Sequence, residues 1–146
     1  MKLYVKTQSH CNSSYQEDKD YGDWHSDSSF SIEGVYASTP DGYNVELIDV
    51  PFDFKPGDAV FVLWMTYSSG DSFGHSEGNG EVLWVFKDAA VALAAKALWQ
   101  KANDKDGHYA VEFIADSGMK VSLSNPAAGY FENLSSLDLS AFLINP

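Results

Sequence analysis

Two short apolar runs constrain the fold of this chain more than any other feature of its sequence. Residues 59–67, AVFVLWMTY, and residues 81–86, EVLWVF, are rich in β-branched and aromatic side chains. A short and almost unbroken apolar run is typical of a strand that is buried on both faces. We therefore expect these runs to pair as interior strands of a β-sheet.

Other stretches of the chain predict further strands around this pair. Strand patterns occur at 2–8, 30–38, 43–50, 108–116, 119–123 and around 137–144. The turn sequence TPDG at 39–42 predicts that 43–50 returns as the hairpin partner of 30–38, and Gly34 indicates a bulge. Residues 51–58 contain two prolines, which exclude them from a central strand, so we expect them to cross over.

One helix is expected over residues 88–104, where alanine predominates and Asp88 is a suitable N-cap. Its apolar stripe is expected to consist of Val91, Ala94, Ala95, Leu98 and Ala102. The elements together predict a single α+β domain over 1–146: a mostly antiparallel sheet of about six or seven strands with one helix packed on a face. The opposite face needs a cover, which residues 9–29 or a second copy in a homodimer would supply.

Two polar segments are expected to be long loops. Residues 9–29 are turn-rich, and residues 68–80, SSGDSFGHSEGNG, join the two apolar runs through thirteen residues, whereas a tight hairpin needs about two to five. The glycines and serines of 68–80 fit an exposed flap with Phe73 against the body, a contact for a partner protein, or a cradle of N–H groups for an anion. Asp71, Glu77 and Glu81 disfavour the anion cradle because they would repel its ligand.

Two groupings of histidines and acids raise the question of a metal. The 68–80 segment offers Asp71, His75, Glu77 and Asn79 at odd spacing, and the 9–29 segment offers Asp23, His25 and Asp27. The simpler interpretation of both is a solvated loop, since neither has the spacing of an established metal motif. No phosphate-binding, dinucleotide-binding or nucleophile-elbow motif is present. We therefore expect no cofactor, no metal and no catalytic residue.

The charge of the chain restricts its partners. Twenty-one acids face nine lysines, there is no arginine, and the net charge is −12. Such a chain is disfavoured for direct binding to nucleic acid or to an anionic membrane, because phosphate neutralisation dominates both. No apolar window is long enough for a membrane span, the N-terminus lacks the apolar core of a signal peptide, and there is one cysteine. These features predict a cytoplasmic protein, and the sign of the charge favours a partner with a basic surface.

The stretch YSSGDSFGHSEGNGEVLWVFKD, followed by the alanine-rich segment, resembles small acidic accessory proteins of tailed bacteriophages, and DYGDW…FSIEGVY is similar to part of the same pattern. The resemblance covers about the middle half of the chain and carries over no catalytic residue. It implies a protein of phage origin that acts in the cytoplasm of a bacterial host, where small acidic phage proteins often blunt host defences.

Three functions are open from the sequence. The leading hypothesis is a non-enzymatic protein that inhibits a host defence or nucleic-acid-targeting complex by presenting a negative surface in place of DNA. The alternatives are a sponge for a nucleotide signal, with 68–80 as its lid, and a metal-dependent enzyme. The residues expected to bind the partner are Glu17, Asp18, Asp20, Asp23, Asp27, Asp71, Phe73, His75 and Glu77.

Overall fold

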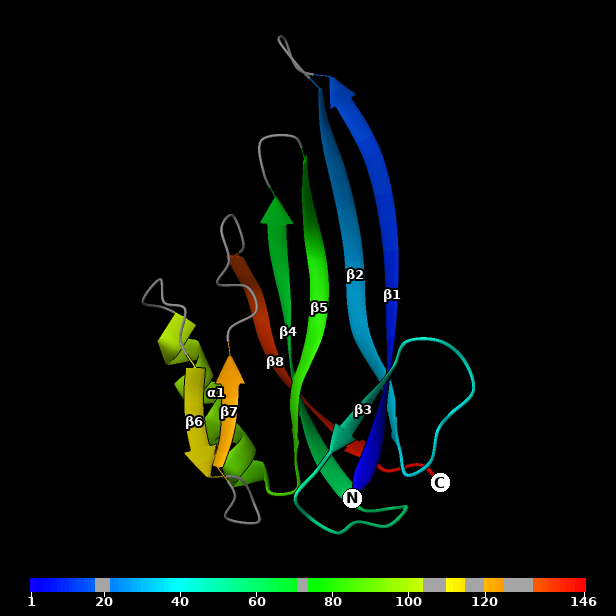
Figure 1. The fold of residues 1–146 in the computed structure, drawn as a ribbon, viewed down its shortest axis with the longest axis vertical. Coiled ribbons are helices and arrows are strands. Elements are labelled where there is room, and N and C mark those ends of the chain that lie inside the picture. Colours follow the sequence, from blue (N-terminus) through cyan, green and yellow to red (C-terminus); the bar gives the residue numbers. More distant parts are fainter. Residues whose placement is uncertain (18–21, 71–73, 104–109, 115–119, 125–132) are drawn as a thin grey trace.

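A computed structural model describes residues 1–17, 22–70, 74–103, 110–114, 120–124 and 133–146 (Figure 1). Eight strands and one helix lie in these ranges. In chain order they are β1 (Lys2–Glu17), β2 (Gly22–Tyr36), β3 (Val45–Asp49), β4 (Ala59–Gly70), β5 (Gly74–Phe86), α1 (Ala89–Asn103), β6 (Ala110–Ile114), β7 (Lys120–Ser124) and β8 (Asn133–Leu143). The predicted α+β class, with a mostly antiparallel sheet and one helix on a face, is confirmed.

The main sheet consists of two antiparallel halves. Its strand order is β3-β1-β2-β5-β4-β8, and β6 and β7 form a separate hairpin beside α1 (Figure 1). Three strands make up each half, and the halves are joined where β2 pairs with β5 in parallel. At the other end of β2 the C-terminal segment, rather than β5, lies beside β2. There Asn145 exchanges backbone hydrogen bonds of 2.8 Å with Val35 and Ala37. The halves therefore separate toward this end.

The larger core fills the space between the two halves. The first half and its flanking residue contribute Leu3, Val5, Val35, Ile48 and Val50, and the second half contributes Val60, Val62, Val82, Val85 and Ile144. All ten side chains are buried, and β3 also lies near β5, so the sheet folds over on itself (Figure 1). The β3-β1-β2 half of the same sheet covers this face, for which residues 9–29 as a loop or a second copy were the expected cover.

A second core lies between α1 and the other face of the β5-β4-β8 half. Leu63 and Met65 of β4 meet Ala92, Ala95 and Trp99 of the helix there. Alternate residues of β4 thus enter opposite cores, which confirms the predicted burial of this strand on both faces.

The start of α1 confirms the predicted cap, but its buried stripe differs from the prediction. The Asp88 Oδ1 atom accepts hydrogen bonds from the backbone N–H groups of Ala90 (2.8 Å) and Val91 (3.1 Å). The buried positions are Ala92, Ala95 and Trp99, whereas Leu98 of the predicted stripe is exposed. The helix is rotated by about one residue because burying the indole of Trp99 removes more apolar surface from water than burying Leu98 would.

Both segments predicted as long loops are largely strand. Residues 9–17 and 22–29 continue β1 and β2, while 68–70 and 74–80 continue β4 and β5. The prediction relied on their polar, turn-rich composition. It failed because each segment extends a strand that the apolar half of the same ribbon already holds in register, so backbone pairing continues past the core.

The predicted hairpin between 30–38 and 43–50 is also wrong, because β3 pairs with β1 rather than with β2. The far edge of β2 is taken by β5 and by Asn145, which leaves the outer edge of β1 for β3. The predicted bulge at Gly34 is confirmed, since the register of β1 with β2 shifts there between Lys6 and Thr7. Residues 51–58 cross over without forming a strand, as predicted.

Candidate functional site

The predicted partner-binding segments meet at one end of the main sheet. The β1–β2 and β4–β5 ribbons both run past the core toward the same end, at the top of Figure 1. β1 ends at Glu17 and β2 begins at Gly22, while β4 ends at Gly70 and β5 begins at Gly74. We call residues 12–17, 22–28, 68–70 and 74–77 the polar end of the sheet.

The parallel pairing of β2 with β5 aligns two similar tripeptides in this polar end. His25 lies opposite His75, Ser26 opposite Ser76, and Asp27 opposite Glu77. The sequence His-Ser-Asp of one strand thus runs beside His-Ser-Glu of the other in the same direction. The sequence analysis noted these histidines and acids separately and missed their relation. The two segments share a His-Ser-acid pattern, but such a pattern does not by itself predict that the segments pair.

The predicted site residues lie at different positions in the sheet. Glu17 is the register partner of Gly22, and Asp23 is the partner of Gln16. Asp27 pairs with both Asn12 of β1 and Glu77 of β5, and His75 pairs with Gly70 of β4 as well as with β2. The structure therefore brings Asp27, His75 and Glu77 together, places Asp23 further along β2, and places Glu17 at the end of β1. Asp18, Asp20, Asp71 and Phe73 lie outside the described residues.

A tight contact between Phe30 and Gly80 marks where the polar end meets the core. A Cβ atom on Gly80 would overlap the ring of Phe30, so only glycine fits this position. The Phe30 ring also packs against Trp64 at a centroid distance of 5.7 Å. These three residues close the core on the side from which the polar end extends.

Beside this boundary, a row of polar side chains links β4 to β8. The Ser136 hydroxyl donates to Asp138 Oδ2 at 3.0 Å, so the 2.6 Å bond between Thr66 and Ser136 has Thr66 as its donor. Trp64 Nε1 donates to the Ser140 hydroxyl at 3.0 Å. All of these groups are partly buried, and each gains a partner that water would otherwise supply. The row holds the edge strand β8 onto β4.

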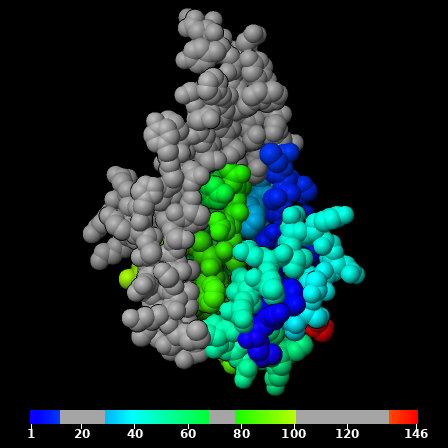
Figure 2. Space-filling view, in the orientation of Figure 1, coloured from blue at the N-terminus to red at the C-terminus, as the bar shows by residue number. Residues whose placement is uncertain are grey.

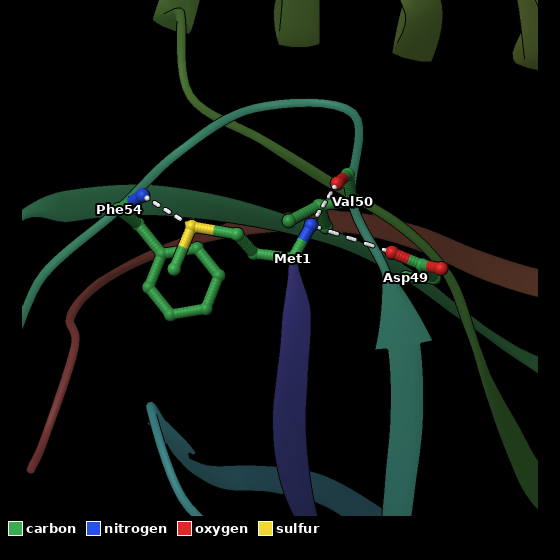
Figure 3. A network of polar contacts seen from close by, with 4 residues as sticks. All are labelled: Met1, Asp49, Val50 and Phe54. Carbon is green, nitrogen blue, oxygen red and sulfur yellow. Dashed lines mark hydrogen bonds and ion pairs between the residues drawn. The ribbon is translucent and has the colours of Figure 1, made fainter.

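A second acidic region, which the sequence analysis did not single out, lies at the opposite end of the sheet. Residues 41–58 carry five acids and one lysine, and most of these acids are exposed. Figure 2 shows this connection at the surface beside β5. The amino-terminal group of Met1 contacts Asp49 Oδ1 at 3.4 Å and donates to the Val50 carbonyl at 2.8 Å, while Phe54 N–H donates to the Met1 sulfur (Figure 3).

Glu46, which belongs to this region, is repelled by the nearby carboxylate of Glu81. Partial desolvation raises the pKa of Glu46, and the nearby Glu81 carboxylate raises it further. Desolvation also raises the pKa of Glu81. Lys6 forms an ion pair with Glu33 at 3.4 Å, but exposed pairs of this kind contribute about 1 kcal/mol or less. Folding therefore favours the protonated form of both Glu46 and Glu81.

Neither comparison nor composition assigns this chain to a known group. No protein-family model, no curated protein and no solved structure matches it significantly.

The helix within the described ranges is not long and apolar enough to cross a membrane. Among the side chains that the structure describes, no three His, Cys, Asp or Glu groups gather closely enough to hold a metal ion.

Proposed function

We propose that this chain is a non-enzymatic acidic binding protein of phage type, which inhibits a host defence or nucleic-acid-targeting complex in the bacterial cell. The observation that supports the proposal most is the convergence of Asp27 and Glu77 at adjacent register positions, with Asp23 further along the same strand. Rigid strands hold acidic positions at fixed spacing more reliably than loops do, which suits a surface that competes with DNA phosphates.

The charge of the whole chain supports the same proposal. With a net charge of −12 and no arginine, the chain has an overall field that attracts basic surfaces and repels nucleic acid. The expected partner is a host protein with a basic, DNA-facing surface. The nucleotide-sponge alternative used residues 68–80 as a long lid, and it loses that support because 68–70 and 74–80 are strand residues.

The test is capture of a partner from bacterial lysate by the immobilised chain, followed by washes of rising salt concentration. The retained protein should be released steeply as ionic strength rises, and duplex DNA should compete for it, because exposed charges are screened by salt and DNA would share the binding surface. A partner whose retention is unchanged across the salt range and indifferent to DNA would contradict the proposal.

Matched charge variants separate location from total charge. One variant neutralises the polar end (Asp23→Asn, Asp27→Asn and Glu77→Gln), and the other neutralises the opposite end (Asp41→Asn, Glu46→Gln and Asp53→Asn). Both change the net charge equally. The polar-end variant should release the partner at much lower salt, whereas the other should retain it nearly as well as the parent. Equal loss in both would mean that only the net charge matters.

A further inference from the structure

The strand β3 lies at one end of the strand order of the main sheet. Within the described part of the chain, β1 is the one strand that pairs with it. Directly before β3, the Thr7 N–H donates to the Asn44 carbonyl at 2.8 Å, and directly after it the Val50 N–H donates to the Met1 carbonyl at 2.9 Å. Hydrogen-bonded pairs alternate along an antiparallel ladder, so the even-numbered residues of β3 are bonded to β1. The odd-numbered residues therefore direct their backbone groups to the outer edge.

This outer edge is open to a further strand. Among the described residues, the outward N–H and C=O groups of Val45 and Leu47 have no hydrogen-bond partner. Unpaired groups of this kind on an edge strand are a template for pairing with another chain.

A row of large side chains ends at the same edge. Ile48 is buried in the larger core, and alternate residues of a strand share a face, so Leu47 faces away from that core. The register partner of Leu47 on β1 is Tyr4, and the partner of Tyr4 on β2 is Tyr36. At the end of this row, Leu47 is 53% exposed. An apolar side chain on an added strand would continue the row, since cross-strand neighbours on one face pack together.

The charges of β3 favour a basic strand beside it. Asp49 has the Met1 amino group at 3.4 Å and Lys2 as its register partner. By contrast, Glu46 is exposed and has no ion pair among the described residues, and the nearby Glu81 carboxylate repels it. A lysine or arginine opposite Glu46 on an added strand would offset this repulsion, because opposite charges at paired positions stabilise a sheet.

A second copy of the chain fits this edge poorly. Pairing of β3 with β3 of another chain would bring together two 41–58 connections, each with five acids and one lysine. Like charges on neighbouring strands destabilise a sheet, and charged side chains on an edge strand commonly prevent self-pairing. The same acids attract a strand of opposite charge, so charge complementarity decides between the two occupants.

We propose that β3 accepts one further strand at its outer edge, from a partner segment in which apolar and basic residues alternate. The N–H and C=O groups of Val45 and Leu47 bond to the backbone of this segment. Its apolar residues pack beside Leu47, and its basic residues lie opposite Glu46. The inference does not depend on the proposed function, because β3 lies at the end of the sheet opposite the polar end and none of the acids of the polar end takes part (Figure 1).

The test uses a synthetic heptapeptide that alternates valine and lysine, with hydrogen exchange of the chain measured by NMR. In the free chain, the amides of Val45 and Leu47 should exchange quickly, while those of Glu46 and Ile48 are protected by β1. Saturating peptide should slow exchange at Val45 and Leu47 by at least about tenfold, because their N–H groups enter backbone hydrogen bonds. A peptide with the same composition in separate blocks of valine and lysine should not, since it cannot place all its apolar residues on one face.

Two variants of Leu47 separate backbone recognition from side-chain recognition. Leu47→Pro removes the outward N–H and should weaken peptide binding about fivefold or more, and proline is tolerated at an edge position of this kind. Leu47→Lys removes the apolar contact, repels the peptide and should weaken binding by at least as much. Leu93→Lys is the matched control, because it changes the charge equally at a residue of α1 that is 60% exposed, and it should leave binding unchanged. If Leu47→Pro does not fold by circular dichroism, Leu47→Lys decides.

The charge variants of the proposed function give an independent check. The opposite-end variant should weaken binding of the peptide, and the polar-end variant should leave it unchanged. This pattern together with failed capture from lysate would refute the proposed function and support the open edge. Exchange at Val45 and Leu47 that the peptide leaves unchanged, or that the block peptide slows equally, would overturn the proposal. Protection of these amides in the free chain, with elution as a dimer from a sizing column, would overturn it in favour of a second copy.

Discussion

The two ends of the β1–β2 ribbon differ in composition: one is apolar and the other is polar. In the half that covers the core, Val5 and Val35 are fully buried and Ile32 packs beside them. In the polar end, the same two strands continue in register through Asn12, Ser13 and Ser14, opposite Asp27, Ser26 and His25. The strands are continuous, but hydrophobic burial stabilises one half, whereas the other half is held by its backbone pairing.

This difference shows that a strand does not need an apolar pattern along its whole length. Once the core half fixes the register, each further residue pair satisfies its own backbone groups at little extra cost in chain entropy. The polar half is then free to carry acids and histidines at fixed spacing. We therefore expect substitutions in the core half to change stability, and substitutions in the polar end to change binding.

The largest effect should come from the core beneath α1. Trp99 has no exposed surface, so Trp99→Ala should lower the free energy of unfolding by about 3–5 kcal/mol, because it leaves a large cavity. Urea denaturation followed by circular dichroism measures this. Leu93→Ala on the same helix is the control, since Leu93 is 60% exposed and should cost less than about 1 kcal/mol. Similar losses for the two variants would break the assignment of this core.

The boundary between the two halves should show an intermediate effect. Gly80→Ala should cost about 1–3 kcal/mol, because the added methyl group overlaps Phe30 and the ring must move. A double-mutant cycle with Phe30→Ala sharpens the test, since removing the ring should abolish most of the cost of Gly80→Ala. Costs that simply add would show that Phe30 does not contact Gly80.

The row of polar side chains between β4 and β8 should contribute about 1 kcal/mol to the free energy of unfolding. Ser136→Ala removes the acceptor of the Thr66 hydroxyl and the donor to Asp138, which leaves partly buried polar groups with fewer partners. Thermal unfolding of this variant is compared with that of Ser31→Ala, an exposed position of β2 that should shift stability by less than about 0.5 kcal/mol. Equal shifts would count against a hydrogen-bonded row.

The smallest effect should appear in the pH dependence of stability. A carboxyl whose pKa is raised on folding stabilises the folded state at low pH, and this contribution is lost as pH rises from about 4.5, the reference value for glutamate. Glu81→Gln should therefore raise stability at pH 7 by about 0.5 kcal/mol or less and should leave it nearly unchanged at pH 4. Glu33→Gln, which breaks the ion pair with Lys6, should have the opposite sign at pH 7.

Local signals in the sequence were sufficient for much of the core half. The unbroken run at 59–67 identified a strand buried on both faces, and Asp88 identified the start of the helix. In each of these cases, burial or capping depends on residues close in the sequence, which is why pattern and composition were informative.

The polar end could not be predicted because its structure depends on distant residues. Residues 22–29 form a strand because β1 and β5 flank them, and β5 is about fifty residues away in the chain. The pairing of β3 with β1 also depends on which edges other strands have left open. Two of the proposed acids, Asp27 and Glu77, thus became neighbours through topology, and no periodicity in either segment indicated this.

The central claim is that residues 24–27 and 74–77 run side by side in parallel register, and cysteine cross-linking tests it most directly. In a Cys11→Ser background, His25→Cys/His75→Cys places two cysteines at paired positions. Their strands lie about 4.8 Å apart, which is within the range of backbone separations that a disulfide spans. Mild oxidation should give a quantitative intramolecular disulfide with the fold retained. His25→Cys/Asn79→Cys, displaced by four residues or about 13 Å along the strand, should not cross-link. Equal cross-linking of both pairs, or of neither, would contradict the account.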